Sequence, residues 1–322
     1  MKLATIYNGS PDGALVVVSK DGRRNVKVVD IAPTLQYALD HWNDAEPALR
    51  HIALRLEEDS DFGDADNVRY AAPLPRAWQW LDGSAFKSHG DLMEKALGVD
   101  PVPLTKPLMY QGMSHIFLGP TQDAVFMRED DDIDFEGEFG VIVDQTPMGV
   151  SAENAMKHIK LILQINDWSL RRLAGPEMRT GFGWIQAKPA CSVAPFAVTP
   201  DELGDSWRDG RVCLDLAVDW NGERFGAANG GAMSVGFHDL IAHAAATREL
   251  CAGTIIGSGT VSNANFREVG SSCIAERRGI EIVDTGAPKT GFMKFGDEVR
   301  MEAQGPDGAL MFGVIEQKVA KA

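Results

Sequence analysis

The chain has 322 residues, enough for one large domain or two modest ones, and its 46 acidic against 31 basic residues give a formal net charge of −15. This excess argues against nucleic acid and against an anionic membrane surface as partners, because both attract basic surfaces. No apolar run approaches the ~20 residues that span a bilayer, and four cysteines without C-x-x-C spacing are more typical of buried thiols than of disulfides. We therefore expect a soluble protein of the cytoplasm.

Residues 1–30 predict short strands that are joined by tight turns. The apolar runs LATIY, ALVVVS and NVKVVD are separated by Asp12-Gly13 and Asp21-Gly22. Asp-Gly between apolar runs is typical of β-hairpins, since both turn positions can require positive φ. The chain is therefore expected to begin with antiparallel strands.

After residue 33 the spacing of apolar residues changes, and after residue 57 the composition changes. Apolar spacings close to 3.6 residues predict one or two helices over 34–58. A polar, acidic loop at 57–67 precedes the proline-rich segment 72–76, and this shift is the best candidate for a domain boundary. We expect a small N-terminal α/β domain over 1–71 and a larger domain over 72–322.

The larger domain is predicted to be mainly β. Its expected strands are apolar or alternating segments with β-branched residues, 135–143, 212–220 and 297–303. Two helices are expected to interrupt them, one over 151–165 with Ser151 as its cap and one over 237–251. Because helices and strands do not alternate regularly, a doubly wound parallel sheet is disfavoured and an α+β, mainly β fold is favoured.

Glu136 and Glu138 are the first candidates for a chemical role. They flank Gly137 at the start of the predicted strand 135–143, and a period of two places both on one face. Two such carboxylates repel each other unless a cation lies between them, and a divalent metal with oxygen ligands meets that need. The alternative for an acidic run is a solvated loop, which we expect for 129–132.

Asp167 is a further candidate, and two interpretations of it remain open. It lies where the apolar periodicity of the predicted helix 151–165 stops, with Arg171 four residues later. Alone, this spacing favours a weak surface ion pair at a helix end. Together with the E-x-E strand, Asp167 becomes a third oxygen ligand.

Asp82 and His89 are seven residues apart, which corresponds to two helical turns and could direct both side chains into one cavity. A lone histidine is more often structural than catalytic. It can nevertheless act as a general base near neutral pH when a carboxylate orients it.

The segment 257–266, GSGTVSNANF, does not match a dinucleotide fingerprint, because Ser262 replaces the last glycine of G-x-G-x-x-G. It is better interpreted as a loop that shapes a pocket, with Thr260 as a hydroxyl donor. Glu276 ends the run SSCIAE, which we interpret as a buried strand with the carboxylate at its exposed end.

Taken together, these segments resemble the fumarylacetoacetate hydrolase (FAH) family over residues 72–322, with a smaller N-terminal domain as in its longer members. The motifs that carry the resemblance are Asp82-x6-His89, Glu136-x-Glu138, Asn166-Asp167-Trp168-Ser169-x-Arg171, Lys188, Ser258-Gly259-Thr260-x-Ser262 and Glu276.

The resemblance implies a mixed β-roll for the C-terminal domain, a homodimer, and Mg²⁺ or Ca²⁺, or alternatively Mn²⁺, as cofactor. The implied metal ligands are Asp82, Glu136, Glu138 and Asp167. The implied catalytic residues are His89 and Glu276, which activate water, and Arg171 and Lys188, the cations near the substrate. The implied substrate contacts are Tyr110 and Thr260.

The implied reaction is hydrolysis of a C–C bond in a β-diketone acid, in the first place fumarylacetoacetate to fumarate and acetoacetate in tyrosine breakdown. The carbanion leaving group must be stabilised as an enolate, which a metal can do as a Lewis acid. Four positions depart from the long members and remove polar substrate contacts: Ser84, Gly98, Ala174 and Met178.

Three alternatives remain. The same site could hydrolyse an acylpyruvate such as fumarylpyruvate or maleylpyruvate. It could decarboxylate an oxo-diacid, a reaction that needs no activated water and so would not depend on the His–Glu pair. A non-catalytic protein that binds a metal and carboxylates is the alternative of another class.

Overall fold

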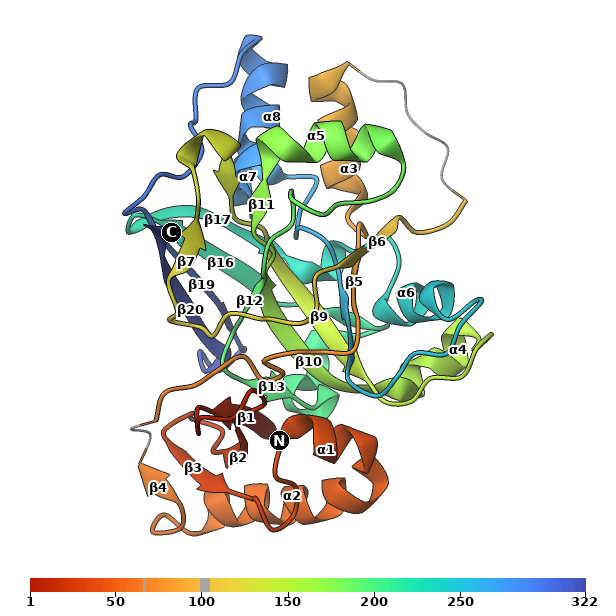
Figure 1. The fold of residues 1–322 in the computed structure, drawn as a ribbon, viewed down its shortest axis with the longest axis vertical. Helices are drawn as coiled ribbons and strands as arrows, with labels where there is room; N and C mark the ends of the chain where they lie inside the picture. The colour runs from red at the N-terminus through yellow and green to blue at the C-terminus, as the bar shows by residue number, and fades with distance from the viewer. Residues whose placement is uncertain (66–67, 99–104) are drawn as a thin grey trace.

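The computed structural model describes residues 1–65, 68–98 and 105–322. The N-terminal part of the chain forms a compact unit at the red end of the ribbon in Figure 1. Its elements are β1 (Lys2–Ile6), β2 (Ala14–Val18), β3 (Arg24–Lys27), α1 (Leu35–Asp40), α2 (Trp42–Glu58) and β4 (Asp64–Ala65).

The remaining elements belong to the larger part of the chain. Its strands are β5 (Trp80–Gly83), β6 (Met109–Gly112), β7 (Ala124–Phe126), β8 (Ile133–Asp134), β9 (Gly137–Val143), β10 (Ile159–Asn166), β11 (Ser169–Leu170), β12 (Ser192–Val193), β13 (Ala197–Val198), β14 (Trp207–Arg208), β15 (Arg211–Val212), β16 (Asp215–Trp220), β17 (Glu223–Asn229), β18 (Thr254–Gly257), β19 (Glu298–Gln304) and β20 (Leu310–Lys321). Its α-helices are α3 (Lys87–Leu97), α4 (Ala152–Ala155), α5 (Arg171–Thr180), α6 (Phe237–Ala244), α7 (Phe266–Val269) and α8 (Ile274–Thr285). Short 3₁₀ helices lie at η1 (Glu129–Asp131), η2 (Met156–His158), η3 (Pro200–Ser206) and η4 (Gly230–Ala232).

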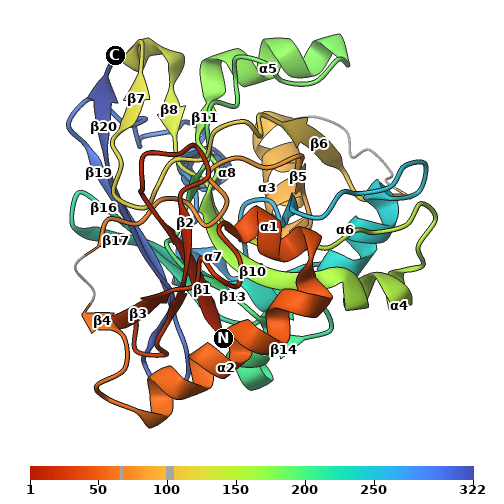
Figure 2. The ribbon, with the colours of Figure 1, turned by 60° about the horizontal axis from the view of Figure 1, so that its bottom comes forward.

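The N-terminal unit confirms the predicted hairpins and helices. β1, β2 and β3 pair antiparallel in sequence, and the turns contain Gly13 and Gly22 with φ of +64° and +75°. The predicted helical segment divides into α1 and α2 at His41. Thr34 caps α1 by accepting the Tyr37 N–H. Figure 2 shows α1 and α2 in front of this part of the sheet.

One eleven-stranded sheet crosses the predicted domain boundary. Its order is β4-β3-β2-β1-β13-β10-β9-β18-β5-β6, with β12 paired to β10. β1 joins β13 through the partners Leu3 and Ala197, so main-chain hydrogen bonds continue from the N-terminal strands into the larger part. The division of the chain into domains at 1–71 and 72–322 therefore stays a prediction.

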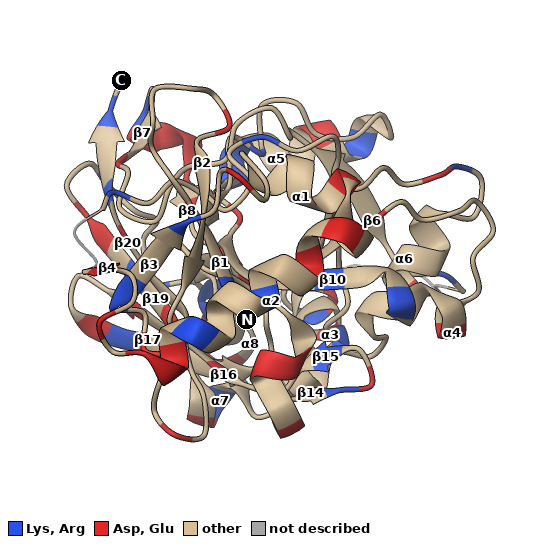
Figure 3. Ribbon diagram, turned by 90° about the horizontal axis from the view of Figure 1, so that it is seen from below, with Lys and Arg blue, Asp and Glu red and all other residues tan. Residues whose placement is uncertain are grey.

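A five-stranded sheet, β17-β16-β19-β20-β7, packs against the first. Phe139 of β9 and Phe312 of β20 meet in the core between them, with ring centroids 5.8 Å apart. The fold is α+β and mainly β, as predicted. Among the described helices, none combines the length and the apolar character that a bilayer crossing requires. In Figure 3, basic residues are interspersed with acidic ones over α1, α2 and the neighbouring strands.

The predicted helix over 151–165 is wrong beyond its first turns. Ser151 does cap a helix by accepting the Asn154 N–H, but 159–166 forms β10, which is buried along most of its length. β10 lies between β9 and β13 in the sheet, and successive residues that point to opposite faces are buried, so both of its faces are covered. A strand that is buried on both faces has a continuous apolar run, which periodicity alone cannot distinguish from a buried helix.

Two further predictions are corrected at the C-terminal side. The helix predicted over 237–251 ends at Ala244 as α6. The run SSCIAE is not a strand, because Cys273 caps α8 and Glu276 lies in its first turn. The described cysteines are free thiols, of which Cys191 and Cys273 are buried and Cys251 is exposed.

Candidate metal and proton-transfer site

Strands β10, β9 and β5 of the large sheet, with β18 between β9 and β5, bring three acidic side chains together. Asp82 lies on β5 and pairs with Gly257 of β18, Glu138 lies on β9 opposite Ile165, and Asp167 directly follows β10. One carboxylate oxygen of Asp82, Glu138 and Asp167 lies within 4.8 Å of the other two. All three residues are buried. The sheet therefore forms a carboxylate cluster from positions that are far apart in the chain.

Glu138 is the least satisfied member of this cluster. Both its carboxylate oxygens are buried, and neither accepts a hydrogen bond from any residue in the described ranges. Burial, with Asp82 and Asp167 close by, raises the pKa of Glu138 well above its ordinary value. Burial likewise raises the pKa of Asp82. A buried cluster of three carboxylates, in which both oxygens of Glu138 are unpaired, fits a hard divalent cation such as Mg²⁺, Mn²⁺ or Ca²⁺, which takes oxygen ligands.

Asp167 is held by three donors on two sides of its carboxylate. Tyr110 Oη and Lys188 Nζ both donate to Oδ2, at 2.7 and 2.5 Å. The Cys191 thiol donates to Oδ1 at 2.9 Å. The Asp167 N–H donates to the Glu136 carbonyl, which fixes its backbone beside β9. The predicted surface pair of Asp167 at a helix end is therefore wrong, because the residue follows a central strand and is buried.

Glu136 has a different environment from Glu138 although only Gly137 separates them. Its Oε1 accepts from Ser169 Oγ at 2.9 Å and lies 2.5 Å from Arg171 and 3.2 Å from Lys188. Its Oε2 accepts from Thr260 Oγ1 at 2.9 Å. Burial opposes its ionisation, but Lys188 and Arg171 together lower the pKa of Glu136 below its ordinary value. Glu136 lies beside the cluster, and its predicted role as a metal ligand stays a prediction.

Arg171 and Lys188 both contact carboxylates. Besides Glu136, Arg171 Nε donates to Asp134 Oδ2 at 2.7 Å, and Lys188 joins Glu136 to Asp167. Asp134 in turn accepts the N–H groups of Ile274 and Ala275 at the start of α8. The predicted contact of Arg171 and Lys188 with a substrate stays a prediction. With Asp134 compensated by the helix terminus, two cations face four carboxylates, and one divalent cation would balance the remainder.

His89 and Glu276 form the second part of the site. His89 lies on α3 and Glu276 on α8, two helices that lie side by side at the same end of the molecule (Figure 1). His89 Nδ1 lies 3.1 Å from Glu276 Oε2, and Ser262 Oγ donates to Oε1 at 2.9 Å. Glu276 is fully buried, so the expectation of an exposed strand end is wrong. Asp82 and His89 are likewise not on one helix, because Asp82 belongs to β5.

Sequence reasoning missed Asp134 and Cys191. Asp134 lies two residues before Glu136 in the acidic run, so the period of two that selected Glu136 and Glu138 could have found it. No local pattern indicates that the Cys191 thiol contacts Asp167. Trp184 was also missed, although its ring packs edge-on to Tyr110 at a centroid distance of 4.7 Å.

The four departures from the long family members are spread over three places. Ser84 directly follows β5, and Gly98 ends α3 in a left-handed conformation. Ala174 and Met178 lie on α5, where Met178 is 61% exposed. The carbonyl of Ala174 accepts a hydrogen bond from Trp184 Nε1. These residues leave the carboxylate cluster and the His89–Glu276 pair unchanged.

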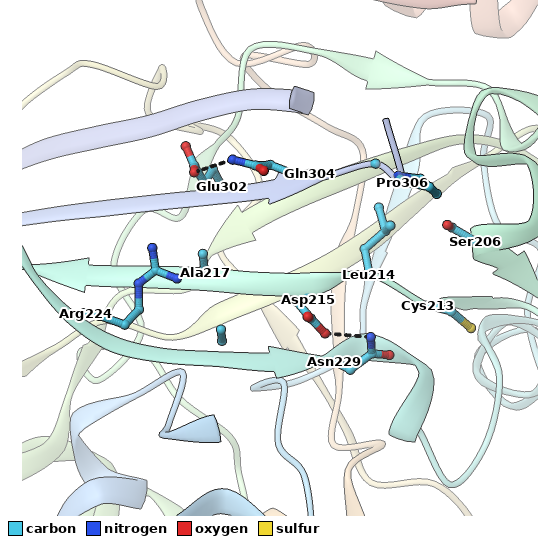
Figure 4. Close-up of a pocket in the computed structure, with 12 residues that line it drawn as sticks. Ser206, Cys213, Leu214, Asp215, Ala217, Arg224, Asn229, Glu302, Gln304 and Pro306 are labelled. Atoms are coloured by element: carbon cyan, nitrogen blue, oxygen red, sulfur yellow. Dashed lines mark hydrogen bonds between the residues drawn. The ribbon is translucent and has the colours of Figure 1, made fainter. Parts of the chain in front are cut away.

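A separate hollow of about 460 Å³ lies over β16, β17 and β19. Figure 4 shows polar side chains around it, including Asp215 hydrogen-bonded to Asn229 and Glu302 to Gln304. None of its described lining residues belongs to the predicted site, so this hollow is distinct from the carboxylate cluster and the His89–Glu276 pair.

Two family profiles match the chain along nearly its whole length. The profile described as fumarylacetoacetate (FAA) hydrolase C-terminal matches residues 79–320. The profile described as fumarylacetoacetase N-terminal domain 2 matches residues 1–76.

Similar curated proteins match over part of their length. A 2,4-didehydro-3-deoxy-L-rhamnonate hydrolase of Sphingomonas sp. (strain SKA58) is 29% identical over 163 residues, 50% of this chain and 54% of that protein. The oxaloacetate tautomerase FAHD2A of Homo sapiens mitochondria is 25% identical over 168 residues, 50% of this chain and 49% of that protein. The matched stretch thus spans about half the length of these relatives.

Solved structures match over the whole chain. A fumarylacetoacetate hydrolase from Exiguobacterium antarcticum has a TM-score of 0.68 at 18% identity and covers 100% of both chains. A maleylpyruvate hydrolase from Sphingobium sp. SYK-6, in complex with manganese(II) and pyruvate, has a TM-score of 0.67 at 17% identity and the same coverage. At these identities the likeness establishes the fold.

Proposed function

The chain belongs to the fumarylacetoacetate hydrolase family, and from this premise we propose that it is a metal-dependent hydrolase that cleaves a C–C bond of a diketo acid. The observation that carries the proposal is the His89–Glu276 pair beside a buried all-oxygen carboxylate cluster. Hydrolysis requires an activated water in addition to an electrophilic centre. Decarboxylation needs no such water, so the histidine–carboxylate pair favours hydrolysis over decarboxylation. Tautomerisation also uses a proton-transfer group, and the substrate panel below distinguishes it from hydrolysis.

Asp82, Glu138 and Asp167 would hold the cation, for which Mg²⁺, Mn²⁺ and Ca²⁺ are the candidates. When bound, a divalent cation supplies a Lewis acid that stabilises the negative charge of the enolate leaving group. The hydrogen bonds to Asp167 determine which of its oxygens is available to the cation. Tyr110 and Lys188 donate to Oδ2, so Oδ1, which accepts only the weak thiol donor of Cys191 among the contacts of the described residues, is the better ligand atom.

His89 is the proposed general base. With its Nδ1–H donated to Glu276 Oε2, the lone pair of Nε2 is available to take a proton from water. Glu276 holds this tautomer, and Ser262 keeps the carboxylate in place through its other oxygen. General base catalysis of this kind contributes about 10²–10⁴ in rate. Water activation and charge stabilisation would therefore come from separate groups of residues.

The substrate is proposed as a diketo acid, with fumarylacetoacetate first and an acylpyruvate second. A relative named as a hydrolase of a didehydro-deoxy-rhamnonate and a solved neighbour named as a maleylpyruvate hydrolase support the acylpyruvate alternative. Tyr110 and Thr260 are proposed as substrate contacts, since their hydroxyls donate hydrogen bonds to Asp167 and Glu136 and so lie next to the cluster. We also propose that the protein forms a homodimer, lies in the cytoplasm and acts in tyrosine breakdown.

A panel of substrates tests the proposal. The purified chain with Mg²⁺ or Mn²⁺ is offered fumarylacetoacetate, fumarylpyruvate, maleylpyruvate and oxaloacetate, and both the diketone absorbance and the carboxylic acid products are measured. Hydrolysis predicts two acid products from at least one diketo acid. His89→Gln should lower kcat by about 10²–10⁴ while KM changes little, because the base acts in the transition state.

Two results would contradict hydrolysis. Interconversion of the keto and enol forms of oxaloacetate without C–C cleavage of any diketo acid would favour the tautomerase named among the relatives. Cation binding without turnover of any member of the panel would favour a non-catalytic binding protein.

A further inference from the structure

A second cluster of metal-ligating side chains lies next to the carboxylate cluster. It consists of His89, Cys273 and Glu276, and one donor atom of each lies within 4.8 Å of the other two. Cys273 and Glu276 are fully buried, whereas the His89 side chain is 20% exposed. A small solute can therefore approach the cluster from the His89 side. Unlike the first cluster, this one combines nitrogen, sulfur and oxygen donors.

Existing contacts direct the three donor atoms toward one another. Cys273 Sγ accepts the Glu276 N–H at 3.3 Å and so holds the sulfur at the N-terminus of α8. Ser262 holds Glu276 through Oε1. The other oxygen, Oε2, therefore faces His89 Nδ1 at 3.1 Å. Glu276 would offer a single oxygen to a ligand at this place.

We propose that His89 Nδ1, Cys273 Sγ and Glu276 Oε2 form an inhibitory site for Zn²⁺. Imidazole, thiolate and carboxylate are the donors that zinc takes, and three protein ligands leave a fourth tetrahedral position for water. Mg²⁺ and Ca²⁺ prefer oxygen ligands, so the two neighbouring clusters select different cations. The binding stands on this geometry alone, whereas its effect on turnover rests on the proposed function.

The protonation changes at this site explain how the cation would inhibit. Burial raises the pKa of the Cys273 thiol well above its ordinary value, so the thiol keeps its proton until a cation replaces it. On binding, the S–H bond breaks, sulfur bonds the cation, and one proton leaves to solvent. The ring proton of His89 moves from Nδ1 to Nε2, and the Nδ1 lone pair bonds the cation. Thiolate and carboxylate then balance the two charges of Zn²⁺.

This proton shift removes the proposed general base. The same Nε2 that must accept a proton from water carries one when Nδ1 holds the cation. Zn–N and Zn–S bonds of about 2.0–2.3 Å place the donor atoms of a tetrahedral site about 3.3–3.7 Å apart. His89 Nδ1 and Glu276 Oε2, at 3.1 Å, already lie near that separation, so only a small adjustment relative to the sulfur is needed. His89 is the most exposed of the three and lies on a surface helix, so its side chain can make that movement.

Cobalt(II) is the probe that tests binding without depending on turnover. The metal-stripped chain is titrated with Co²⁺ in a large excess of Mg²⁺, which occupies the all-oxygen cluster. One Co²⁺ per chain should bind, with a thiolate-to-cobalt charge-transfer band in the near ultraviolet and release of one proton. Cys273→Ser should lose the band, and serine is itself a good N-cap, so α8 should be preserved. Cys191→Ser is the matched control, because Cys191 is the other buried thiol beside a carboxylate, and it should retain the band.

Each outcome is decisive. Absence of the band in the unaltered chain, its persistence in Cys273→Ser, or its loss in Cys191→Ser alone would overturn the proposal. His89→Gln provides a second variant at a more exposed position, and it should weaken Co²⁺ binding at least tenfold while the protein stays folded. If a diketo acid is turned over, Zn²⁺ should inhibit the unaltered chain at least tenfold more strongly than Cys273→Ser. If no substrate is found, the spectra and the proton count still decide whether the site exists.

Discussion

Glu136 and Glu138 differ although only Gly137 separates them at the start of β9. On one side, Glu136 has four polar partners, two of which are cations. On the other side, Glu138 has none among the residues that the structure describes. The pKa of Glu136 is lowered by Lys188 and Arg171 against burial, and the pKa of Glu138 is raised by burial. The partners, and not the residue type, decide which carboxylate is already compensated and which one needs a cation.

The comparison also distinguishes a carboxylate that holds the fold together, Glu136, from one that is available to a cation, Glu138. Arg171 ties Glu136 to Asp134, which holds the start of α8. This side therefore connects the carboxylate cluster to the helix that carries Glu276. The Glu138 side connects to nothing comparable in the described ranges, and it is the side where a cation would add the missing positive charge.

The largest expected effect is on the compensated side. Glu136→Gln should lower the free energy of unfolding by about 3 kcal/mol, because the buried Lys188 and the partly buried Arg171 lose their shared anion and keep only Asp167 and Asp134. Urea unfolding of the metal-free protein measures this change. A loss below about 1 kcal/mol would show that Glu136 is not the anchor of Arg171 and Lys188.

Glu138→Gln should have the opposite pattern. Mn²⁺ affinity, measured by calorimetry, should fall by more than about 100-fold, since loss of a ligand exceeds the 10–100-fold cost of losing an outer-shell partner. Stability without metal should be unchanged or increased, because an uncompensated buried charge has been removed. Unchanged Mn²⁺ affinity would place the cation elsewhere.

Tyr110→Phe tests whether the hydrogen bond from Tyr110 orients Asp167 for cation binding. It removes one of the donors to Oδ2 while Lys188 remains. A hydrogen bond to a charged group contributes about 1.5–3 kcal/mol, of which only a part should appear as weaker Mn²⁺ binding because the neighbouring donor remains. We expect about a tenfold loss of affinity with little change of secondary structure. Binding that is unaltered, together with a normal KM for substrate, would remove Tyr110 from the site.

The smallest effect is expected for an ion pair at the surface, which serves as the reference for the buried site. Asp201 bonds Arg50 at 3.0 Å and is 55% exposed. Burial of the group acts in the opposite direction, but the hydrogen bond from Arg50 lowers the pKa of Asp201. A lowered folded pKa means that the stabilisation is present above the unfolded value of about 3.9 and is lost as pH falls through the folded value.

Asp201→Asn should therefore cost about 0.2–1 kcal/mol at pH 7 and progressively less below pH ~4. Thermal unfolding across this range measures the difference. Asp12→Asn is the matched control, because Asp12 forms a comparable exposed pair with Arg76. A constant difference between the Asp201 variant and the unaltered chain at all pH values would contradict the assignment.

Local patterns predicted the parts of the fold that local interactions dominate. The Asp-Gly turns gave the β1–β2–β3 hairpins because the turn geometry depends on a few neighbouring residues. The helices α1 and α2 followed from their amphipathic period, and Ser151 capped the helix that it was expected to cap. Where an element is buried on every side, as in β10, period carries no information and the prediction of a helix was wrong.

The sequence by itself determined which residue types were available, where the hairpins turn, and, through the resemblance of its motifs, the family. The motifs also identified Asp82, Glu138, Asp167, His89 and Glu276, which the fold brings into two adjacent clusters. Only the tertiary structure decided which carboxylate is paired with a cation and which is not, and that Cys273 lies against His89 and Glu276. The physical reason is that charge compensation and burial depend on strands and helices far apart in the chain, whose side-chain contacts no local pattern encodes.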